Sequence, residues 1–349
     1  MTAHPSVLAA LASAVLFGAS LPLAKLLAES LSPVLLAGLL YLGSGIGLTV
    51  VRAVRDRSLA PPAMSRQQWC WLAAAIALGG VLGPILLMFG LARASAADAS
   101  LLLNLETVLT AVLAWVIFGE NAGRRVLLGM ALIVAGGAVL ASAGQAGVAA
   151  GGSVGAAAIA LACLCWALDN NLTRRVAGAD AIFIASTKGW IAGTTNLLLA
   201  FALGARLPAW PMVARAMALG LVGYGISLVL FVLALRGLGS ARTAAYSATA
   251  PFVGAAIAIV GFHEPITGGF WLAAALMGCG VWLHLTERHD HPHTHAPLAH
   301  QHIHFHDEHH RHVHDFPWDG SEPHSHQHEH EPIAHRHPHV PDLHHRHDH

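Results

Sequence analysis

The chain has 349 residues, of which 55% are hydrophobic and 11% charged, and its 19 basic and 19 acidic residues give no formal net charge. Its mean hydropathy is +0.57. A soluble globular domain carries about 25% charged residues, so the composition excludes an ordinary soluble domain and favours a membrane protein. The sequence contains no visible nucleophile–base set and no phosphate-binding loop. We therefore expect neither an enzyme nor a nucleic-acid partner.

Ten apolar segments follow one another, most of them close to the roughly 20 residues that a transmembrane helix requires. The first lacks a positively charged start and is followed by further spans, so it is predicted to be a membrane helix and not a signal peptide. The segments lie near 6–27, 33–51, 69–91, 96–118, 126–143, 153–171, 181–203, 214–235, 243–262 and 268–286. These segments predict an all-α protein with ten transmembrane helices in a lipid bilayer.

Arginines are distributed unequally between the loops. One alternating set of loops holds Arg52, Arg55, Arg57, Arg66, Arg124, Arg125, Arg174, Arg175, Arg236 and Arg242, and the other holds only Arg93, Arg206 and Arg215. Short loops rich in Lys and Arg stay in the cytoplasm. We therefore expect both termini in the cytoplasm, in a membrane of the bacterial inner-membrane type.

The sequence repeats itself at a spacing of 144 residues. The segment LETVLTAVLAWVIFGE aligns with TAPFVGAAIAIVGFHE, so that Glu120 matches Glu264 and Thr107 matches Pro251. These four residues form a structural repeat motif, which predicts five-helix halves at 1–143 and 144–286. Five is odd, so the second half enters the membrane in the opposite sense. Inverted repeats are typical of secondary transporters, whose substrate site lies between the halves near mid-membrane.

With its five-plus-five layout and the LETVLTAVLAWVIFGE stretch, the chain resembles the drug/metabolite transporter superfamily of the EamA type over about residues 6–286. The resemblance implies an inner-membrane carrier, often an exporter driven by a cation gradient, and some relatives are associated with nickel and cobalt resistance. Two positions depart from the pattern: Thr107 replaces the usual proline, and Ala250 stands where a second acidic residue would match Glu106. A site built unequally from the two halves is therefore expected.

Charged residues at membrane depth are costly, and the few present are candidate site residues. Glu106 lies in the middle of the fourth segment, two residues after Asn104, and Lys188 lies well inside the seventh. Buried alone, Glu106 could carry a proton, whereas paired with Lys188 it would stay charged. A purely structural Glu106–Lys188 bridge remains an alternative. Lys25, near the end of the first segment, is read mainly as an interfacial anchor.

Further polar and aromatic residues complete the predicted substrate path. Asp169 and Asn170 follow Trp166 near the end of the sixth segment, and Trp190 lies beside Lys188. A helix-end cap or an interfacial cluster explains Asp169 and Asn170 equally well. The four cysteines, Cys70, Cys163, Cys165 and Cys279, form no CxxC pair and are read as small buried hydrophobes.

Residues 287–349 form a tail that holds most of the 26 histidines, many of them in HxH spacing. Imidazole is a ligand for nickel, cobalt and zinc, and most histidines are neutral in a cytoplasm. The predicted metal ligands are His291, His293, His295, His300, His302, His304, His306, His309, His310, His312, His314, His324, His326, His328 and His330. The tail lacks apolar periodicity, so it is expected to be disordered without metal.

Three functions are compatible with these features. The leading one is a transition-metal exporter, with nickel or cobalt favoured and zinc next, whose tail captures or senses metal. The second is an exporter of a small metabolite, such as an amino acid or another anion that meets Lys188, with a regulatory tail. The third is a membrane-anchored metal buffer or sensor. No cofactor is required by any of them, and the sequence leaves a homodimer open.

Overall fold

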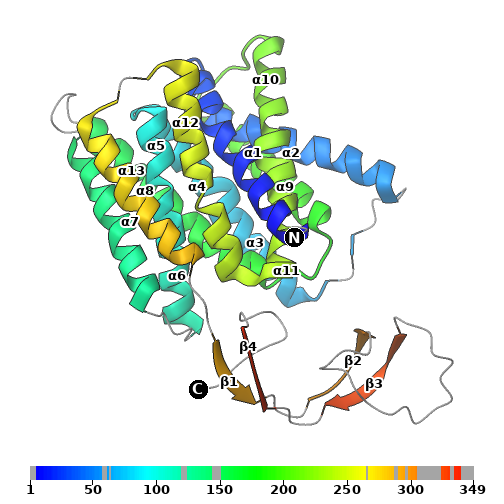
Figure 1. Ribbon diagram of the computed structural model, residues 1–349. Coiled ribbons are helices and arrows are strands. Elements are labelled where there is room, and N and C mark those ends of the chain that lie inside the picture. Colours follow the sequence, from blue (N-terminus) through cyan, green and yellow to red (C-terminus); the bar gives the residue numbers. More distant parts are fainter. Residues whose placement is uncertain are drawn as a thin grey trace. The chain divides into compact units, whose positions relative to one another are not determined.

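The computed structural model describes residues 5–56, 61–62, 64–118, 124–143, 151–264 and 266–286 and, in the tail, 290–294, 298–304, 324–330 and 334–338. The chain divides into two compact units, Met1–Glu287 and Arg288–His349. The first unit is helical throughout its regular described segments, and the second contains four short strands. Figure 1 shows the helices of the first unit as one bundle.

The described residues of this bundle form fifteen helical elements. The first half consists of α1 (Pro5–Ala28), α2 (Pro33–Asp56), α3 (Arg66–Ala75), η1 (Ile76–Leu82), α4 (Gly83–Leu91), α5 (Ala96–Leu102), α6 (Asn104–Phe118) and α7 (Arg124–Ala143). The second half consists of α8 (Gly151–Arg174), α9 (Ala181–Ala202), α10 (Trp210–Gly220), η2 (Leu221–Ile226), α11 (Ser227–Ser247), α12 (Ala250–Phe262) and α13 (Gly268–Leu285).

These elements form the ten predicted transmembrane segments. Seven stretches of described residues are both long and apolar enough to cross a bilayer, and α7 and α13 contain shorter apolar helices. The remaining segment, the seventh in chain order, is α9, which is long enough but carries Lys188 and Asn196 in its interior. Helix α1 begins and α13 ends on the same side of the bundle (Figure 1), as an even number of spans requires. The expected fold class of the membrane part is therefore confirmed.

Helix α11 contains the border between the eighth and ninth segments. The two stretches that are long and apolar enough to cross a bilayer are Trp210–Leu238 and Thr243–Phe262, in agreement with the segments predicted near 214–235 and 243–262. The regular helix continues to Ser247, since glycine within a helix costs only about 1 kcal/mol and Gly237 and Gly239 do not end it. A break inside the ninth segment falls at Ala248 and Thr249, directly before α12, whose first turn contains Pro251.

The two halves are related by the spacing of the sequence repeat. Helices α2 and α9 pack against each other more extensively than any other pair. They cross at Gly45 and Gly189, two residues 144 positions apart, and a Cβ on Gly189 would lie 2.4 Å from the Gly45 nitrogen. Small residues permit such close backbone approach in membrane helices. The second symmetric contact joins α7 with α13, side by side in Figure 1.

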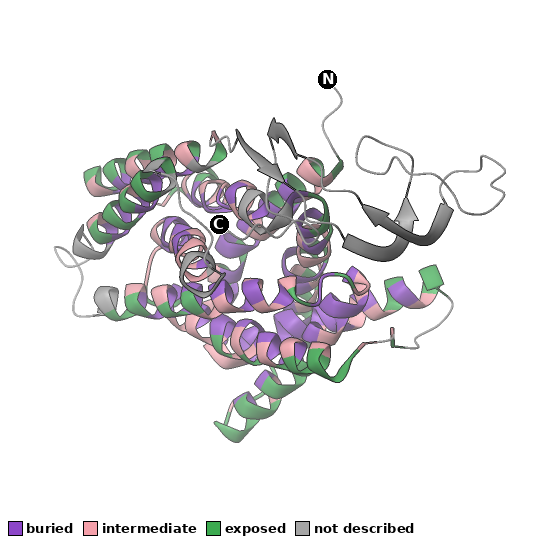
Figure 2. Cartoon of the chain, turned by 90° about the horizontal axis from the view of Figure 1, so that it is seen from below, coloured by how far each residue is buried: buried purple, intermediate pink, exposed green. Residues whose placement is uncertain are grey.

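In addition, the first helix of each half packs against helices of the other half. Helix α1 of the first half packs on α11 and α12 of the second, and α8 of the second half packs on α4 and α6 of the first. Figure 2 shows buried residues between the helices and exposed ones on their outer sides. Many of the exposed residues are large and apolar, including Val260 and Trp271. A soluble monomer rarely exposes so much apolar surface, but a surface that contacts lipid does.

Each half contains one π-helical segment at an equivalent position. The segment η1 interrupts the third span and η2 interrupts the eighth, and Gly79 and Gly223 within them are 144 residues apart. A π-helical turn changes the backbone hydrogen-bond pattern and often marks a functional site. The repeat therefore places one such segment on each side of the bundle's interior.

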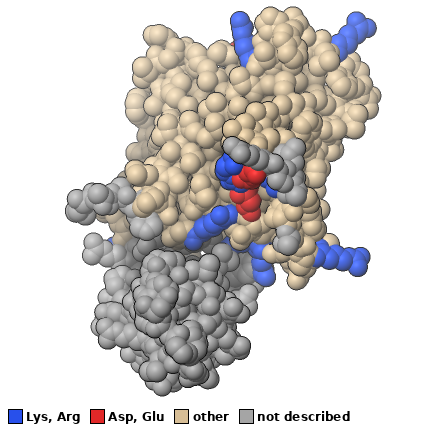
Figure 3. Space-filling view, turned by 90° about the vertical axis from the view of Figure 1, so that its right-hand side faces the viewer, with Lys and Arg blue, Asp and Glu red and all other residues tan. Residues whose placement is uncertain are grey.

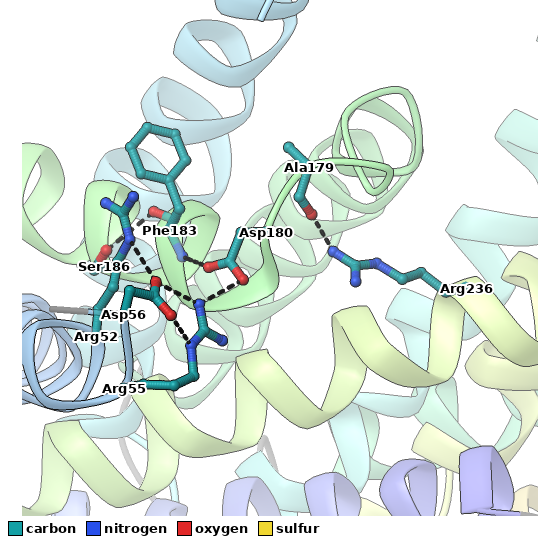
Figure 4. Close-up of polar contacts among 8 residues, drawn as sticks. All are labelled: Arg52, Arg55, Asp56, Ala179, Asp180, Phe183, Ser186 and Arg236. Carbon is teal, nitrogen blue, oxygen red and sulfur yellow. Dashed lines mark hydrogen bonds and ion pairs between the residues drawn. The ribbon is translucent and has the colours of Figure 1, made fainter. Parts of the chain in front are cut away.

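One face of the bundle, here called the arginine face, contains the ends of α2 and α8 and the part of α11 around Arg236. Arg55 at the end of α2 pairs with Asp180, 2.8 Å away, just before α9. Arg236 of α11 donates to the carbonyl oxygens of Ala177 and Ala179 in the same connection (Figure 4). Figure 3 shows charged side chains at the upper edge of one side and in its lower half, with uncharged surface between them.

On the opposite face, two charged side chains hold the connection between α4 and α5. Lys25 at the end of α1 donates to the carbonyl oxygens of Leu91 and Ala94, both at 2.7 Å. Glu264 accepts from the backbone amides of Ala96 and Ala97, at 3.0 and 2.9 Å. A cation at a helix C-terminus and an anion at a helix N-terminus are both favourable. Lys25 thus caps a helix in addition to lying near the membrane surface.

The tail forms two pairs of antiparallel strands in its described residues. Strand β1 (Asp290–Thr294) pairs with β4 (Ala334–Pro338), and β2 (Leu298–His304) pairs with β3 (His324–His330). This pairing differs from the expected disorder because alternating polar residues are compatible with extended backbone. A two-stranded sheet is at best marginally stable in water. Disorder of the metal-free tail in solution therefore stays a prediction.

Replacement of Glu264 by Gln should lower the stability of the helical unit. Glutamine is neutral and has one acceptor oxygen, so both amides at the start of α5 lose a charged partner and one of them loses its acceptor, at a cost of about 1.5–3 kcal/mol. We expect Glu264→Gln to lower the melting temperature of the purified full chain in detergent. Glu29→Gln, which changes an exposed carboxylate near the same face, is the matched control. Equal melting temperatures for the two variants would contradict the capping role.

Candidate functional site

A cavity of about 130 Å³ lies where the two halves meet. It is lined by parts of α1, α2, α6, α8, α9, η2, α11 and α12. Its lining reaches Asp169 and Asn170 near the end of α8 and Lys188, about two turns into α9. These ends belong to the arginine face, so the cavity lies in the half of the bundle nearer that face.

Glu106 enters the cavity from the first turn of α6. The chain turns at Leu103, between α5 and α6, so the start of α6 lies inside the bundle and directs its first residues into the cavity. The Glu106 Oε1 accepts a hydrogen bond from Asn170 Nδ2 at 2.7 Å. The amino-terminal end of a helix also favours a negative charge. Both features favour the charged form of the carboxylate, which burial opposes.

Lys188 pairs with Asp169 and not with Glu106. Its Nζ lies 2.5 Å from Asp169 Oδ1 and 2.9 Å from Thr173 Oγ1, and Thr173 itself donates to Asp169 at 2.9 Å. The lysine is 2% exposed and the aspartate 7%. Removal of one partner from such a buried pair leaves an uncompensated charge. The Glu106–Lys188 bridge considered from the sequence is therefore replaced by a Lys188–Asp169 pair.

The η1 segment provides space for Asp169 and hydrogen-bond acceptors for the aromatic residues. A Cβ on Gly79 would lie 1.9 Å from Asp169 Oδ2, so no other residue fits there without displacement. The Gly79 carbonyl oxygen accepts from Tyr41 Oη at 2.8 Å and from Trp166 Nε1 at 2.9 Å. Glycine at this position thus fixes one carboxylate and two aromatic side chains together.

Aromatic rings form the apolar part of the lining. Phe17 contacts Trp166 and Tyr224 edge-on, with ring centroids 5.9 and 5.7 Å apart, and Tyr41 lies 5.5 Å from Tyr224. Phe231 lines the same cavity from α11. Edge-to-face rings of this kind are typical of packed aromatic clusters. They provide a cation or an apolar solute with a mostly rigid wall.

The repeat makes the two sides of the cavity chemically unequal. Three pairs of residues related by the 144-residue spacing all line it. They are Leu103 and Ser247, Glu106 and Ala250, and Thr107 and Pro251. In each pair one residue is polar or charged and the other apolar, so the polar groups do not repeat across the cavity.

Five predicted path residues, Glu106, Lys188, Asp169, Asn170 and Trp166, line the cavity together, as do Thr107 and Pro251. Their role in transport stays a prediction. Two others lie elsewhere.

Asn104 is fully buried and donates to the Leu101 carbonyl oxygen at 3.2 Å. Trp190 is 43% exposed and donates to Thr49 at 2.8 Å. Neither residue lines the cavity, because Asn104 is buried near Met277 of α13 and Trp190 lies on the exposed side of α9.

Some lining residues were not identified from the sequence. Phe17, Tyr41, Thr110 and Ser247 contribute to the wall, yet each is an ordinary residue of an apolar helix. The alignment of the repeats offers one signal, because Ser247 corresponds to Leu103, one helical turn before Glu106. Glu120 of the repeat motif lies outside the described residues, so its predicted structural role stays a prediction.

The predicted metal ligands fall partly in the paired strands. Strand pairing places His300 opposite His328, His302 opposite His326, and His304 opposite His324. His291 and His293 lie in β1, and His330 ends β3. Within the residues described, no cluster of three or more His, Cys, Asp or Glu side chains could hold a metal ion. The remaining candidates, His295, His306, His309, His310, His312 and His314, lie outside the described residues.

The chain was compared with known protein families. The sequence profile of the EamA-like transporter family matches residues 4–142 and again residues 153–286. The chain belongs to this family. It is therefore a multi-pass membrane protein of a transporter family, which is not an enzyme class. The resemblance to the drug/metabolite transporter superfamily, drawn from the repeat motif, is confirmed.

Two relatives support this assignment. An uncharacterized transporter of Methanothermobacter thermautotrophicus is 26% identical over 284 residues, which cover 77% of this chain and 82% of that protein. A crystal structure, described only as that of a protein, matches with a TM-score of 0.63 at 20% identity, over 80% of this chain and 94% of the other. The second similarity concerns the fold alone.

Loss of Asp169 should destabilise this EamA-family protein more than loss of the whole ion pair. In Asp169→Asn the buried Lys188 has no counter-charge, at a cost of about 3–5 kcal/mol. We expect a large fall in the melting temperature for Asp169→Asn and partial recovery in the double variant Asp169→Asn, Lys188→Met. Thermal unfolding of the purified full chain measures both. A double variant less stable than Asp169→Asn would contradict a simple charge pair.

Proposed function

We propose that this EamA-family transporter exports a small organic solute that carries a positively charged group, and that Glu106 binds that group. The observation that carries the proposal is the pairing inside the cavity. Asp169 and Lys188 compensate each other at 2.5 Å, whereas Glu106 has a neutral amide partner. Glu106 is thus available to a cation that enters the cavity.

The same pairing argues against the anionic substrate considered from the sequence. That alternative requires Lys188 to meet a carboxylate of the solute. The ammonium group is buried and bonded to Asp169 and Thr173, so a solute would have to break an ion pair in a region of low dielectric. An amino acid remains compatible if its amino group is the part that meets Glu106.

The size and lining of the cavity indicate a small solute. Its volume of about 130 Å³ is below the roughly 300–1,000 Å³ of pockets for drug-sized ligands. Phe17, Trp166 and Tyr224 provide aromatic surface close to the carboxylate. A cation over an aromatic face gains about 0.5–2 kcal/mol. These features favour a compact amine with an apolar body.

A carboxylate in this position also suits coupling to a proton gradient. Glu106 could hold the solute in one state and a proton in the other, so that the cavity returns to the first face without an unpaired buried charge. With both termini in the cytoplasm of a bacterial-type inner membrane, the arginine face is cytoplasmic and the cavity lies nearer that side. Solute would then be collected from the cytoplasm and released outside.

Glu106→Gln should abolish export while leaving the protein folded, because the amide keeps the shape of the side chain and the hydrogen bond with Asn170 but lacks the charge. We would compare the culture medium of cells that produce the full chain, Glu106→Gln or the surface control Glu29→Gln, using untargeted mass spectrometry. Amines and amino acids should accumulate with the full chain and with Glu29→Gln only. Accumulation of acids without an amino group, or equal accumulation with Glu106→Gln, would refute the proposal.

The histidine-rich tail favours a second candidate, export of a transition metal with the tail capturing or sensing cytoplasmic ion. Nickel, cobalt and zinc all suit imidazole ligands. The cavity is less suited to a bare metal ion, because Glu106 is its one carboxylate free of Lys188 among the lining residues. The thiol of Cys163 is buried against the Leu102 carbonyl oxygen and does not line the cavity.

Metal export and metal storage give different results in one experiment. Cells without their own efflux systems are loaded with nickel, cobalt or zinc, and cell-associated metal is followed by mass spectrometry. If the transporter exports metal, the full chain speeds its loss and Glu106→Gln does not. A chain stopped after Arg288 then shows whether the tail feeds the cavity. Metal retained by the tail regardless of Glu106 would instead indicate a membrane-anchored buffer.

A further inference from the structure

Three residues that line the cavity have a buried hydroxyl group with no hydrogen-bond partner in the described structure. They are Thr110 of α6, Tyr224 of η2 and Ser247 at the end of α11. The side chains of Thr110 and Tyr224 are almost fully buried, with 6% and 5% of each residue exposed. Buried hydroxyls are normally bonded to protein or water. Three such groups in the lining residues of a single cavity indicate that something enters it and bonds to them.

A comparison of two neighbouring tyrosines separates a structural hydroxyl from an available one. The rings of Tyr41 and Tyr224 lie 5.5 Å apart. The Tyr41 hydroxyl donates to the Gly79 carbonyl oxygen at 2.8 Å, whereas the Tyr224 hydroxyl has no partner among the described residues. The Tyr41 hydroxyl thus has a structural hydrogen bond, whereas the Tyr224 hydroxyl in the same aromatic cluster is available to a ligand.

Close packing of η2 prevents Tyr224 from moving to find a partner. A Cβ on Gly223 would lie 2.4 Å from the Ser20 Cβ, and a Cβ on Gly225 would lie 3.0 Å from Ser44 Oγ. The segment is therefore held between α1 and α2 on both sides of Tyr224. π-Helical turns often occur at functional sites, and this one fixes the position of Tyr224 in the cavity wall.

We infer that Tyr224, with Thr110 and Ser247, determines specificity by bonding to a second polar group of the solute. This inference rests on the proposed function, in which Glu106 binds the cationic group. The solute class is a small amine that also carries a hydroxyl, amide or carboxylate. An amine with the same apolar body and no second polar group binds more weakly, because the three hydroxyls then stay unpaired or retain only water.

The test uses three amines with one apolar body: isoamylamine, leucinol and leucinamide, of which the last two add a hydroxyl and an amide. Binding to the purified full chain in detergent is measured by calorimetry. Leucinol and leucinamide should bind wild type about tenfold more tightly than isoamylamine, since a hydrogen bond of about 1.4 kcal/mol corresponds to tenfold.

Tyr224→Phe should reduce this ratio about two- to tenfold by weakening the binding of leucinol and leucinamide. The combined variant Thr110→Val, Tyr224→Phe, Ser247→Ala should remove the preference.

Tyr41→Phe is the matched control, because its hydroxyl has a structural partner. Tyr41→Phe should lower the melting temperature of the solute-free protein, and Tyr224→Phe should not. A large fall in the melting temperature for Tyr224→Phe would overturn the inference.

Binding that depends on Glu106 but shows no preference among the three amines, or an unchanged preference in the combined variant, would overturn the inference alone. Binding that persists in Glu106→Gln, or no binding of any amine, would overturn the proposed function and the inference with it.

Discussion

The arrangement of the interior depends on the ion pair between Lys188 and Asp169. Two opposite charges brought out of water must bond to each other and to further polar groups, or the desolvation cost is not recovered. Here Thr173 bonds to both partners, and Gly79 leaves the space that Asp169 occupies. The pair joins α8 to α9 next to η1, and it leaves Glu106 as a carboxylate with only an amide partner.

The fold could be predicted from the sequence to a large extent. Membrane helices are recognised by their length and hydropathy, and the match of Glu120 with Glu264 indicates the spacing of the two halves. The same spacing appears in the structure at Gly45 with Gly189 and at the two π-helical segments. The continuation of α11 to Ser247 was not predictable, because glycine and helix length give no firm end point for a helix that packing stabilises.

The site could be predicted only in part. A charged residue in an apolar segment is conspicuous, so Glu106, Asp169 and Lys188 were all found, but which of them pair depends on how each helix is rotated in the bundle. Asn104 shows this limit: two positions before Glu106, it faces a different neighbour, near Met277. Hydroxyl residues such as Thr110 are common in membrane helices, and only the absence of a partner among the described residues distinguishes it.

The tail and the cavity differ in the chemistry they offer. Imidazole groups in HxH spacing suit soft or borderline metal ions, whereas the cavity combines one available carboxylate with aromatic rings and hydroxyls. If a metal crossed the membrane here, it would have to leave many nitrogen ligands for few oxygen ligands, which is unfavourable unless the ion keeps ligands of its own. A small amine faces no such exchange. The tail therefore fits better as a sensor or store acting on a carrier of organic solutes than as the first part of a metal path.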